Sequence, residues 1–317
     1  MLVLMVSTYS WNSLSNSEDV FRDNILVVDT DAGADDAMAI SLLLNGTRDS
    51  RIKIAGITCV RGNTGVHNVS KNVLKTLDVN GRLEIPVFEG SDSGLVKTSA
   101  IDSYFGDDGL GDFNYPVPLV GISHTPAALF LANIVRRNPG KVTIMAIGPP
   151  TNLAVASLIY PDFYKNIKNI IFLGGSTTGI GNMNGSEFNI WVDPYAAEAV
   201  FSKAVFSPII VIPTETLRLV QIPLSWRKEV LGVKETAVMG FLNQAEGKEP
   251  QSGPYWSLAD QIAAAVVVDP FIVLSSFVGR PHLSLNGSMT VTKDGHDVRV
   301  ISSVDVDRLK TMLEILL

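Results

Sequence analysis

The sequence predicts one α/β domain over residues 25–317, with a Rossmann-like mixed, mostly parallel sheet and helices on both of its faces. Three observations support this fold class. Short apolar strands alternate with helices along the chain, the strands have few polar interruptions, and polar side chains gather directly after the strands. Hydrophobic residues make up 46% of the 317 residues, which is enough for a large core and excludes a disordered chain.

The first half of the chain contains three predicted strands and two predicted helices. We expect strands over 25–28, 53–60 and 86–88, and helices over 35–44 and 66–77. The second helix places its apolar side chains on one face, as an amphipathic helix on a sheet does. Residues 90–118 are rich in Gly, Asp, Ser and Pro, and we expect them to form a long, functional loop.

The second half continues the alternation. We expect helices over 125–137, 152–159 and 193–201, and strands over 142–147, 167–173 and 209–212. Residues 214–260 are predicted to be mostly helical, with a loop around 247–254. A short apolar run over 266–268 follows them, and we expect site residues directly after it, at Asp269, as after the other strands. The segment 289–317 predicts a short β-ribbon and then a helix over 305–316.

The first 24 residues read as a disordered tail or as a weak or truncated signal. Residues 1–6 are apolar, but no charged region precedes them. Four Asn-x-Ser/Thr triplets, at Asn45, Asn68, Asn184 and Asn286, are compatible with secretion. The cytoplasm is the favoured compartment, and secretion is the alternative.

Composition excludes several classes of partner. The net charge of −7 leaves no basic surface for nucleic acid. The single cysteine, Cys59, excludes an internal disulfide and a cysteine-based zinc site. No uncharged apolar run approaches the roughly 18 residues of a membrane span, so we expect no membrane partner.

Four carboxylates fall within eight residues after the first strand: Asp29, Asp31, Asp35 and Asp36. A helix N-terminus stabilises one or two such charges by about 0.3–1 kcal/mol each. Four of them raise one another's pKa unless a cation neutralises them. Because the donors are hard oxygens, Ca²⁺ or Mg²⁺ fits and Zn²⁺ does not. The alternative is that one Asp caps the helix and the others face water.

The same segment allows a second chemical interpretation. In a phosphotransferase with an Asp-x-Asp-x-Thr motif, Asp29 would be the nucleophile and Asp31 the acid/base. The fifth position of the motif is Gly33 here, which argues against this interpretation.

Five segments together resemble the inosine–uridine-preferring nucleoside hydrolase family, and they occur in the order of that family. They are residues 29–40, 60–64, 146–154, 187–190 and 269–270. The resemblance implies the nucleoside hydrolase fold, a Ca²⁺ ion at the strand ends and a homodimer or homotetramer. It also implies hydrolysis of the N-glycosidic bond of a ribonucleoside to free base and ribose.

The resemblance also implies a set of site residues. The metal ligands are Asp31, Asp36, the main-chain oxygen of Ile147, and Asp269. Asp31 is in addition the general base for a water that the metal positions. The ribose hydroxyls would be bound by Asp35, Asn63, Glu187 and Asn189. Glu187 and Asn189 point the same way if their segment is extended. Asn182, with Asn184 as its rival, is the candidate for the 5′-hydroxyl.

The leaving-group acid is not determined. Many members place a histidine before the late aspartate and another in the long loop, where this chain has Val268 and Phe105. Two residues could replace them. Trp256 could stack on the base, or pack in the core; Asp260 could donate a proton, or serve as a helix N-terminal charge.

These departures leave two further questions. Trp256 and the missing histidines favour purine nucleosides. They also leave open a catalytically impaired relative that binds a nucleoside or ribose without cleaving it.

Overall fold

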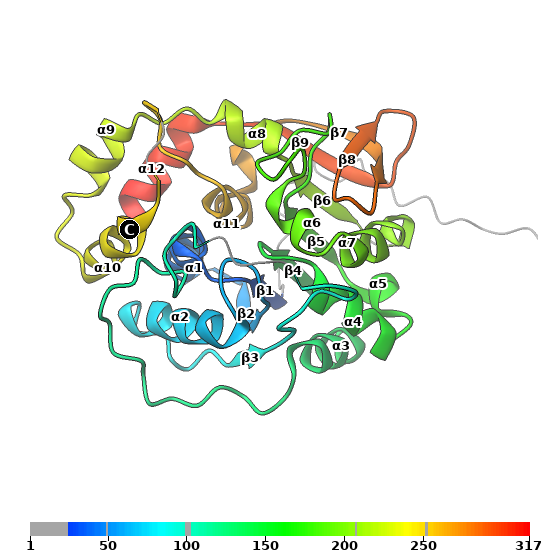
Figure 1. Cartoon of the computed structure of the whole chain (residues 1–317), viewed down its shortest axis with the longest axis horizontal. Helices are drawn as coiled ribbons and strands as arrows, with labels where there is room; N and C mark the ends of the chain where they lie inside the picture. Colours follow the sequence, from blue (N-terminus) through cyan, green and yellow to red (C-terminus); the bar gives the residue numbers. More distant parts are fainter. Residues whose placement is uncertain (1–24, 49, 99–102, 207, 251–252) are drawn as a thin grey trace, which may run out of the picture.

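The computed structural model describes residues 25–317 except 49, 99–102, 207 and 251–252 (Figure 1). The tail or signal expected over residues 1–24 lies outside the described residues. Six parallel strands form the main part of the sheet. They are β1 (Ile25–Thr30), β2 (Lys53–Cys59), β3 (Val87–Glu89), β4 (Val142–Ala146), β5 (Asn169–Leu173) and β6 (Ile209–Ile212).

Three C-terminal strands extend this sheet on the β6 side. β9 (Val298–Val304) pairs parallel with β6, β7 (Val273–Leu283) antiparallel with β9, and β8 (Met289–Thr292) antiparallel with β7. The order in the described chain is β3-β2-β1-β4-β5-β6-β9-β7-β8, which confirms the mixed, mostly parallel sheet. The sequence did not predict β7, because its mostly half-buried or exposed positions form no continuous apolar run.

Helices cover both faces of the sheet (Figure 1). On β1, Leu26 and Val28 pack into one core while Val27 packs into the other, as alternating side chains require. The first core includes α1 (Ala34–Gly46), α2 (Val66–Val79), α10 (Ala237–Ala245), α11 (Asp260–Val268) and α12 (Val306–Leu316). The second includes α3 (Ala127–Arg137), α4 (Thr151–Ile159), α5 (Phe163–Asn166) and α7 (Pro194–Phe201).

The remaining helices are short. They are α6 (Phe188–Val192), η2 (Ala204–Phe206), α8 (Thr214–Leu219), α9 (Leu224–Trp226), the π-helical turn η3 (Arg227–Leu231), η4 (Glu246–Lys248) and η5 (Pro270–Ile272). None of the helices in the described part of the chain combines the length and apolar character that crossing a bilayer requires.

The apolar run over 266–268 is the last turn of helix α11 and not the end of a strand. Short apolar runs do not distinguish a buried strand from a buried helix. α11 packs along α1, so its first residue, Asp260, lies near the start of α1. Because of this correction, Asp260 at the start of α11, and not Asp269 after its end, lies near the site.

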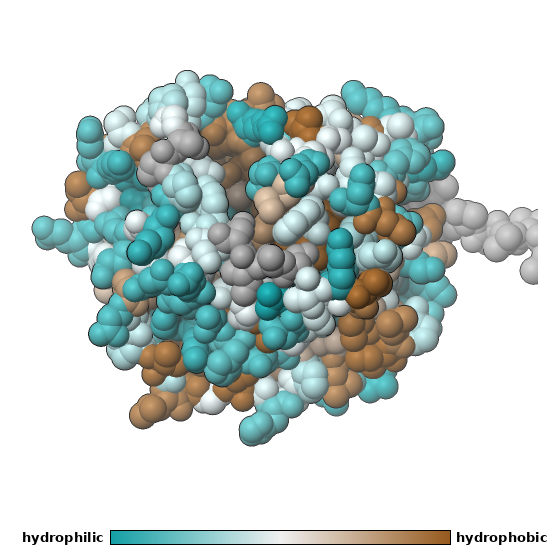
Figure 2. Space-filling model, viewed as in Figure 1, coloured by the Kyte–Doolittle hydropathy of each residue, from teal (hydrophilic) through white to brown (hydrophobic). Residues whose placement is uncertain are grey.

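Exposed apolar side chains gather over α3 and α4 (Figure 2). Leu158 and Ile159, at the C-terminal end of α4, are among them. Because α4 runs back along the sheet, this end lies away from the carboxyl ends of the strands. Those carboxyl ends, where ligands bind in open parallel sheets, carry the site.

Candidate functional site

A cavity of about 450 Å³ opens at the carboxyl ends of the parallel strands. Its wall has two chemical parts. One part, here called the polar floor, is formed by Asp31, Asp35, Asn63, Ile147, Asn182, Glu187, Asn189 and Asp260. The other, here called the aromatic wall, is formed by Tyr104, Phe105, Phe188, Tyr255 and Trp256, and Glu249 also lines the cavity. A ligand with a polar half and a flat apolar half matches this division.

Three carboxylates meet at the polar floor, where Asp36 is buried next to the two lining residues Asp35 and Asp260. Asp35 and Asp36 come from the first turn of α1 and Asp260 from the first turn of α11, and one oxygen of each lies within 4.8 Å of the others. Asp36 is fully buried and is hydrogen-bonded by the backbone N–H of Gly33 at 2.8 Å and the Asn63 amide at 3.3 Å. The side chains of Asp36 and Asp260 are hydrogen-bonded to each other.

Burial and mutual repulsion raise the pKa values in this group. Burial first, and then the charge of Asp36, holds the pKa of Asp31 and of Asp260 well above the ordinary range. Burial also raises the pKa of Asp36, to about 6, although hydrogen bonds from Thr30 and Gly33 oppose the shift. A divalent cation among these oxygens would offset both the repulsion and the cost of desolvation. The all-oxygen donor set therefore fits Ca²⁺ or Mg²⁺.

Asp31 is held by tightly packed backbone at the end of β1. The backbone N–H of Asn63 donates to its Oδ2 at 2.9 Å. A Cβ atom at Gly62 would lie 2.0 Å from the same oxygen, and one at Gly148 would lie 3.0 Å from Oδ1. Two glycines thus let the loops after β2 and β4 close on this carboxylate, which is only 1% exposed.

Glu187 and Asn189 lie together on the floor, but their segment is not extended as expected. Glu187 is the N-cap of α6 and accepts from the backbone N–H groups of Gly175 (2.9 Å), Asn189 (2.9 Å) and Ile190 (3.2 Å). The Asn189 amide donates to the main-chain oxygen of Ile147 at 3.1 Å. The helical turn still brings both side chains to the cavity.

The two candidates for the 5′-hydroxyl differ in position. Asn182 lines the cavity, whereas Asn184 is not among the described lining residues. Asn184 has a φ of +53° and sits between Met183 and Ser186, whose backbones are hydrogen-bonded to each other. Asn182, which lines the cavity, therefore stays the candidate for the 5′-hydroxyl.

The structure does not bring Asp269 to the carboxylate group. Asp269 follows the last residue of α11, about 13 Å along the helix axis from Asp260 at ~1.5 Å per residue. Its Oδ2 accepts from Arg308 and its Oδ1 from the backbone N–H of Phe271 at 3.1 Å. The expectation that Asp269 is a metal ligand is therefore corrected in favour of Asp260.

Replacing Asp269 by Asp260 also changes which residue stands directly before the aspartate, where a histidine was expected. Val268 packs close to Gly46 and not at the cavity. The residue before Asp260 is Ala259, which does line the cavity and carries no titratable group. Asp260 was expected as a proton donor, and the structure places it among the carboxylates of the floor instead.

Asp29 does not reach the cavity. Its Oδ1 accepts from Thr58 Oγ1 at 2.5 Å and from the Asn152 amide at 2.8 Å, and the side chain is fully buried. Burial raises its pKa to about 7. An enclosed carboxylate cannot attack a substrate, which argues against the phosphotransferase interpretation.

Trp256 belongs to the aromatic wall and is also firmly packed. It is 2% exposed, its ring lies 5.4 Å below the guanidinium of Arg227, and Trp226 stands 6.5 Å away. Arg227 is paired with Glu246 at 2.8 Å. Trp256 therefore packs in the core and also lines the cavity, and its contact with a base stays a prediction.

The sequence did not single out several lining residues: Tyr104, Arg218, Gln221, Glu249 and Tyr255. They come from three loops or helix ends that are far apart in the chain. No periodic pattern or spacing connects them. The long loop over 90–118 was expected to be functional, and it contributes Tyr104 and Phe105.

The parallel sheet and the oxygen-rich cavity at its strand ends define an α/β protein whose acidic cluster offers oxygen ligands beside a cavity of small-molecule size. The family model for inosine-uridine preferring nucleoside hydrolases matches residues 26–311, and the chain belongs to this family.

Curated relatives share part of the chain. The probable uridine nucleosidase 2 of Arabidopsis thaliana is 39% identical over 181 residues, which are 56% of this chain and 55% of that protein. The pyrimidine-specific ribonucleoside hydrolase RihA of Citrobacter koseri is 34% identical over 199 residues, 62% of each chain. The match thus spans between half and two thirds of these relatives.

Solved structures match over a larger part. A plant nucleoside hydrolase has a TM-score of 0.84 and 28% identity, covering 93% of this chain and 98% of its own. The purine-preferring ribonucleoside hydrolase of Gardnerella vaginalis has a TM-score of 0.79 and 26% identity, covering 92% of this chain and 100% of its own.

Proposed function

We propose that the protein hydrolyses the N-glycosidic bond of ribonucleosides, releasing free base and ribose, and that it depends on Ca²⁺. One observation carries this proposal: carboxylates from the start of α1 and the start of α11 gather on the floor of a cavity that also has an aromatic wall. Membership of the nucleoside hydrolase family supports the same reaction.

The proposed metal ligands are Asp31, Asp36, Asp260 and the main-chain oxygen of Ile147. All four supply oxygen, and they lie at or beside the cavity floor. When bound, Ca²⁺ supplies the positive charge that positions a water molecule and the sugar diol.

The side chains of the floor divide the remaining work. Asp31 takes a proton from the attacking water, and its position on the cavity floor, where the backbone N–H of Asn63 holds its Oδ2, supports this role. The ribose hydroxyls are bound by Asp35, Asn63, Glu187 and Asn189, and the 5′-hydroxyl by Asn182. The transition state resembles an oxocarbenium ion, and the carboxylates stabilise its positive charge.

The base preference stays a prediction. Loss of the expected histidines and the ring of Trp256 favour purines. The curated relatives above are named for uridine and pyrimidine substrates, whereas one solved relative is named as purine-preferring. The chain's own aromatic wall, which can stack on either base, is the part of the site that decides the preference.

A substrate panel tests the proposed function. Release of reducing sugar is measured from inosine, guanosine, adenosine and uridine, with Ca²⁺ and after chelation. We expect turnover of at least one nucleoside with Ca²⁺ and its loss with chelator. Metal-loaded protein that binds a nucleoside but releases no sugar would instead identify a binding relative without activity.

A further inference from the structure

The cavity contains an acid that the roles above do not use. This inference rests on the proposed hydrolysis, in which the departing base keeps the electrons of the broken bond and needs a proton. No histidine is among the described residues that line the cavity. Asp260 is hydrogen-bonded to Asp36 on the floor, and the indole N–H of Trp256 is too weak an acid. The proton must come from another group.

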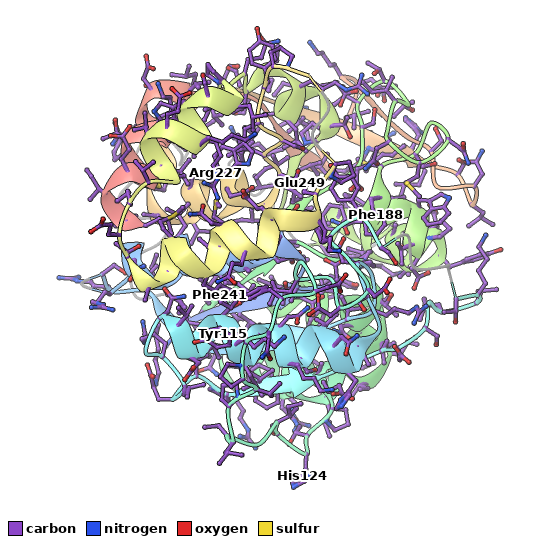
Figure 3. The ribbon with its side chains drawn as sticks, turned by 60° about the vertical axis from the view of Figure 1, so that its left-hand side comes forward. Tyr115, His124, Phe188, Arg227, Phe241 and Glu249 are labelled. Carbon is purple, nitrogen blue, oxygen red and sulfur yellow. The ribbon has the colours of Figure 1, made fainter. Side chains whose placement is uncertain are left out.

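Glu249 lines the cavity next to Tyr104, one of the aromatic side chains that a base can stack on. It follows η4, just beyond the end of α10 (Figure 3), and lines the cavity beside the aromatic wall. The phenol oxygen of Tyr104 lies 3.5 Å from Glu249 Oε1. The ring of Tyr104 stands edge-to-face on Phe105, with centroids 4.8 Å apart. Phe105 in turn abuts Gly33 at the start of α1. This chain of contacts connects Glu249 to the edge of the polar floor.

A ribonucleoside bound by its hydroxyls on the polar floor directs its base away from that floor. The aromatic wall offers a flat, apolar surface to the base, and Glu249 is the lining carboxyl group that lies within 3.5 Å of one of its members, Tyr104. Its neighbour Glu246 does not serve, because it is paired with Arg227 at 2.8 Å and is not among the described lining residues.

Burial and the neighbouring charges both act on the pKa of Glu249. Burial, and then the charge of Glu246, raises its pKa to about 8, while Tyr104 and Arg227 oppose this shift. Asp35 lies close enough for the two carboxyl groups to repel each other when ionised, and the charge of Glu249 raises the pKa of Asp35. A carboxylic acid that titrates near the working pH is suited to donate a proton.

We propose that Glu249 is the general acid that protonates the leaving base, with Tyr104 positioning its carboxyl group. As the C1′–N bond breaks, its electron pair stays on the base, and the proton of Glu249 is added to a ring nitrogen or carbonyl oxygen of the base. Asp31 takes a proton from water, and the hydroxide oxygen forms the new bond to C1′. Asp31 then releases its proton to solvent and Glu249 regains one, so the net reaction consumes one water.

Two substrates with different leaving groups test this assignment in the Glu249→Gln variant. Inosine needs protonation of its base, whereas 4-nitrophenyl β-D-ribofuranoside releases a phenolate that leaves without it. We expect kcat for inosine to fall by about 100-fold or more, in line with general acid catalysis, and kcat for the nitrophenyl riboside to change by only a few-fold. The alkaline limb of the inosine pH profile should disappear.

Two further variants complete the experiment. Glu229→Gln makes the same chemical change at an exposed glutamate on η3 and should leave both rates unchanged. Tyr104→Phe removes a hydrogen bond that favours ionised Glu249, so the alkaline limb should move to higher pH. A Tyr104 that only packs the loop would leave the position of that limb unchanged.

The outcomes distinguish a wrong assignment of Glu249 from a wrong assignment of the reaction. If wild-type protein cleaves both compounds and Glu249→Gln loses both equally, or loses neither, Glu249 is not the acid. If wild-type protein with Ca²⁺ cleaves neither compound, the proposed hydrolysis is overturned, and the assignment of Glu249 with it.

Discussion

The side chains of Asp36 and Asp260 are hydrogen-bonded to each other at the floor of the cavity, although they belong to the first and the second-last long helices of the chain. Two carboxylates make such a contact only when they share a proton, or when a cation takes the place of that proton. The packing of α11 along α1 holds them together. This contact makes the floor a place where proton and metal compete.

Metal retention should depend on Asp260 and not on Asp269. We expect Asp260→Asn to weaken Ca²⁺ binding by at least about 10-fold, since it removes a charged oxygen from the carboxylate group. Asp269→Asn is the matched control and should leave the affinity unchanged, because Asp269 is engaged by Arg308. Calorimetric titration with Ca²⁺ measures both. If only the Asp269 variant lost affinity for Ca²⁺, Asp269 and not Asp260 would be the metal ligand.

Asp31→Asn should reduce turnover by about 100-fold or more, because the amide cannot accept the proton of the attacking water. The change keeps the size of the side chain, so Gly62 and Gly148 can still pack against it. Release of reducing sugar at saturating Ca²⁺ measures the effect, with exposed Asp162→Asn as the control. A wild-type rate in the Asp31 variant would refute its role as the base.

The metal-free protein should lose stability as pH rises. The pKa values of Asp36 and Asp29 are raised from 3.8 to about 6 and about 7, and those of Asp31 and Asp260 are also raised. The native state therefore binds more protons than the unfolded chain above the ordinary carboxyl pKa, and stability falls as pH rises through the native values.

Melting temperatures between about pH 5 and about pH 8 measure this effect, with chelator and with Ca²⁺. We expect the temperature to fall across this range in chelator and to fall less with Ca²⁺, which replaces the protons. A melting temperature that rises with pH in the metal-free protein would contradict the raised pKa values of the buried carboxylates.

Recognition of the 5′-hydroxyl should depend on Asn182. We expect wild-type protein to prefer inosine over 5′-deoxyinosine in kcat/KM, and Asn182→Ala to reduce that preference by about 5-fold, the value of one hydrogen bond of ~1 kcal/mol. Asn184→Ala, two positions away on the turn, is the matched control and should keep it. If the Asn184 variant loses the preference and the Asn182 variant keeps it, the assignment is reversed.

The part of the site closest to the first strand was predictable from the sequence. Asp31, Asp35 and Asp36 lie within one short segment, and the rule that ligands bind at the carboxyl ends of parallel strands places them. Asn63 follows from the same rule, since it comes directly after β2, whereas Ile147 was implied only by the resemblance to the family. For the three aspartates and Asn63, their position directly after a predicted strand was sufficient.

The choice between Asp260 and Asp269 could not be made from local sequence patterns. A run of three valines fits a strand or a helix equally well, and the choice decides whether the site follows the run or precedes it. The structure makes it a helix, so Asp260 enters the carboxylate group and Asp269 turns to Arg308. The neighbours of a side chain across the fold, and not its own residue type, made this decision.

By itself the sequence determined the alternation of strands and helices, the family and the acidic segment after β1, because these depend on residues near one another in the chain. Only the tertiary structure decided which distant side chains complete the cavity. The partner of Asp36 and the group that faces the base, Glu249, depend on how α11, the end of α10 and the loop of Tyr104 pack over the sheet. Packing is a sum of many weak contacts between remote segments, and no local pattern encodes it.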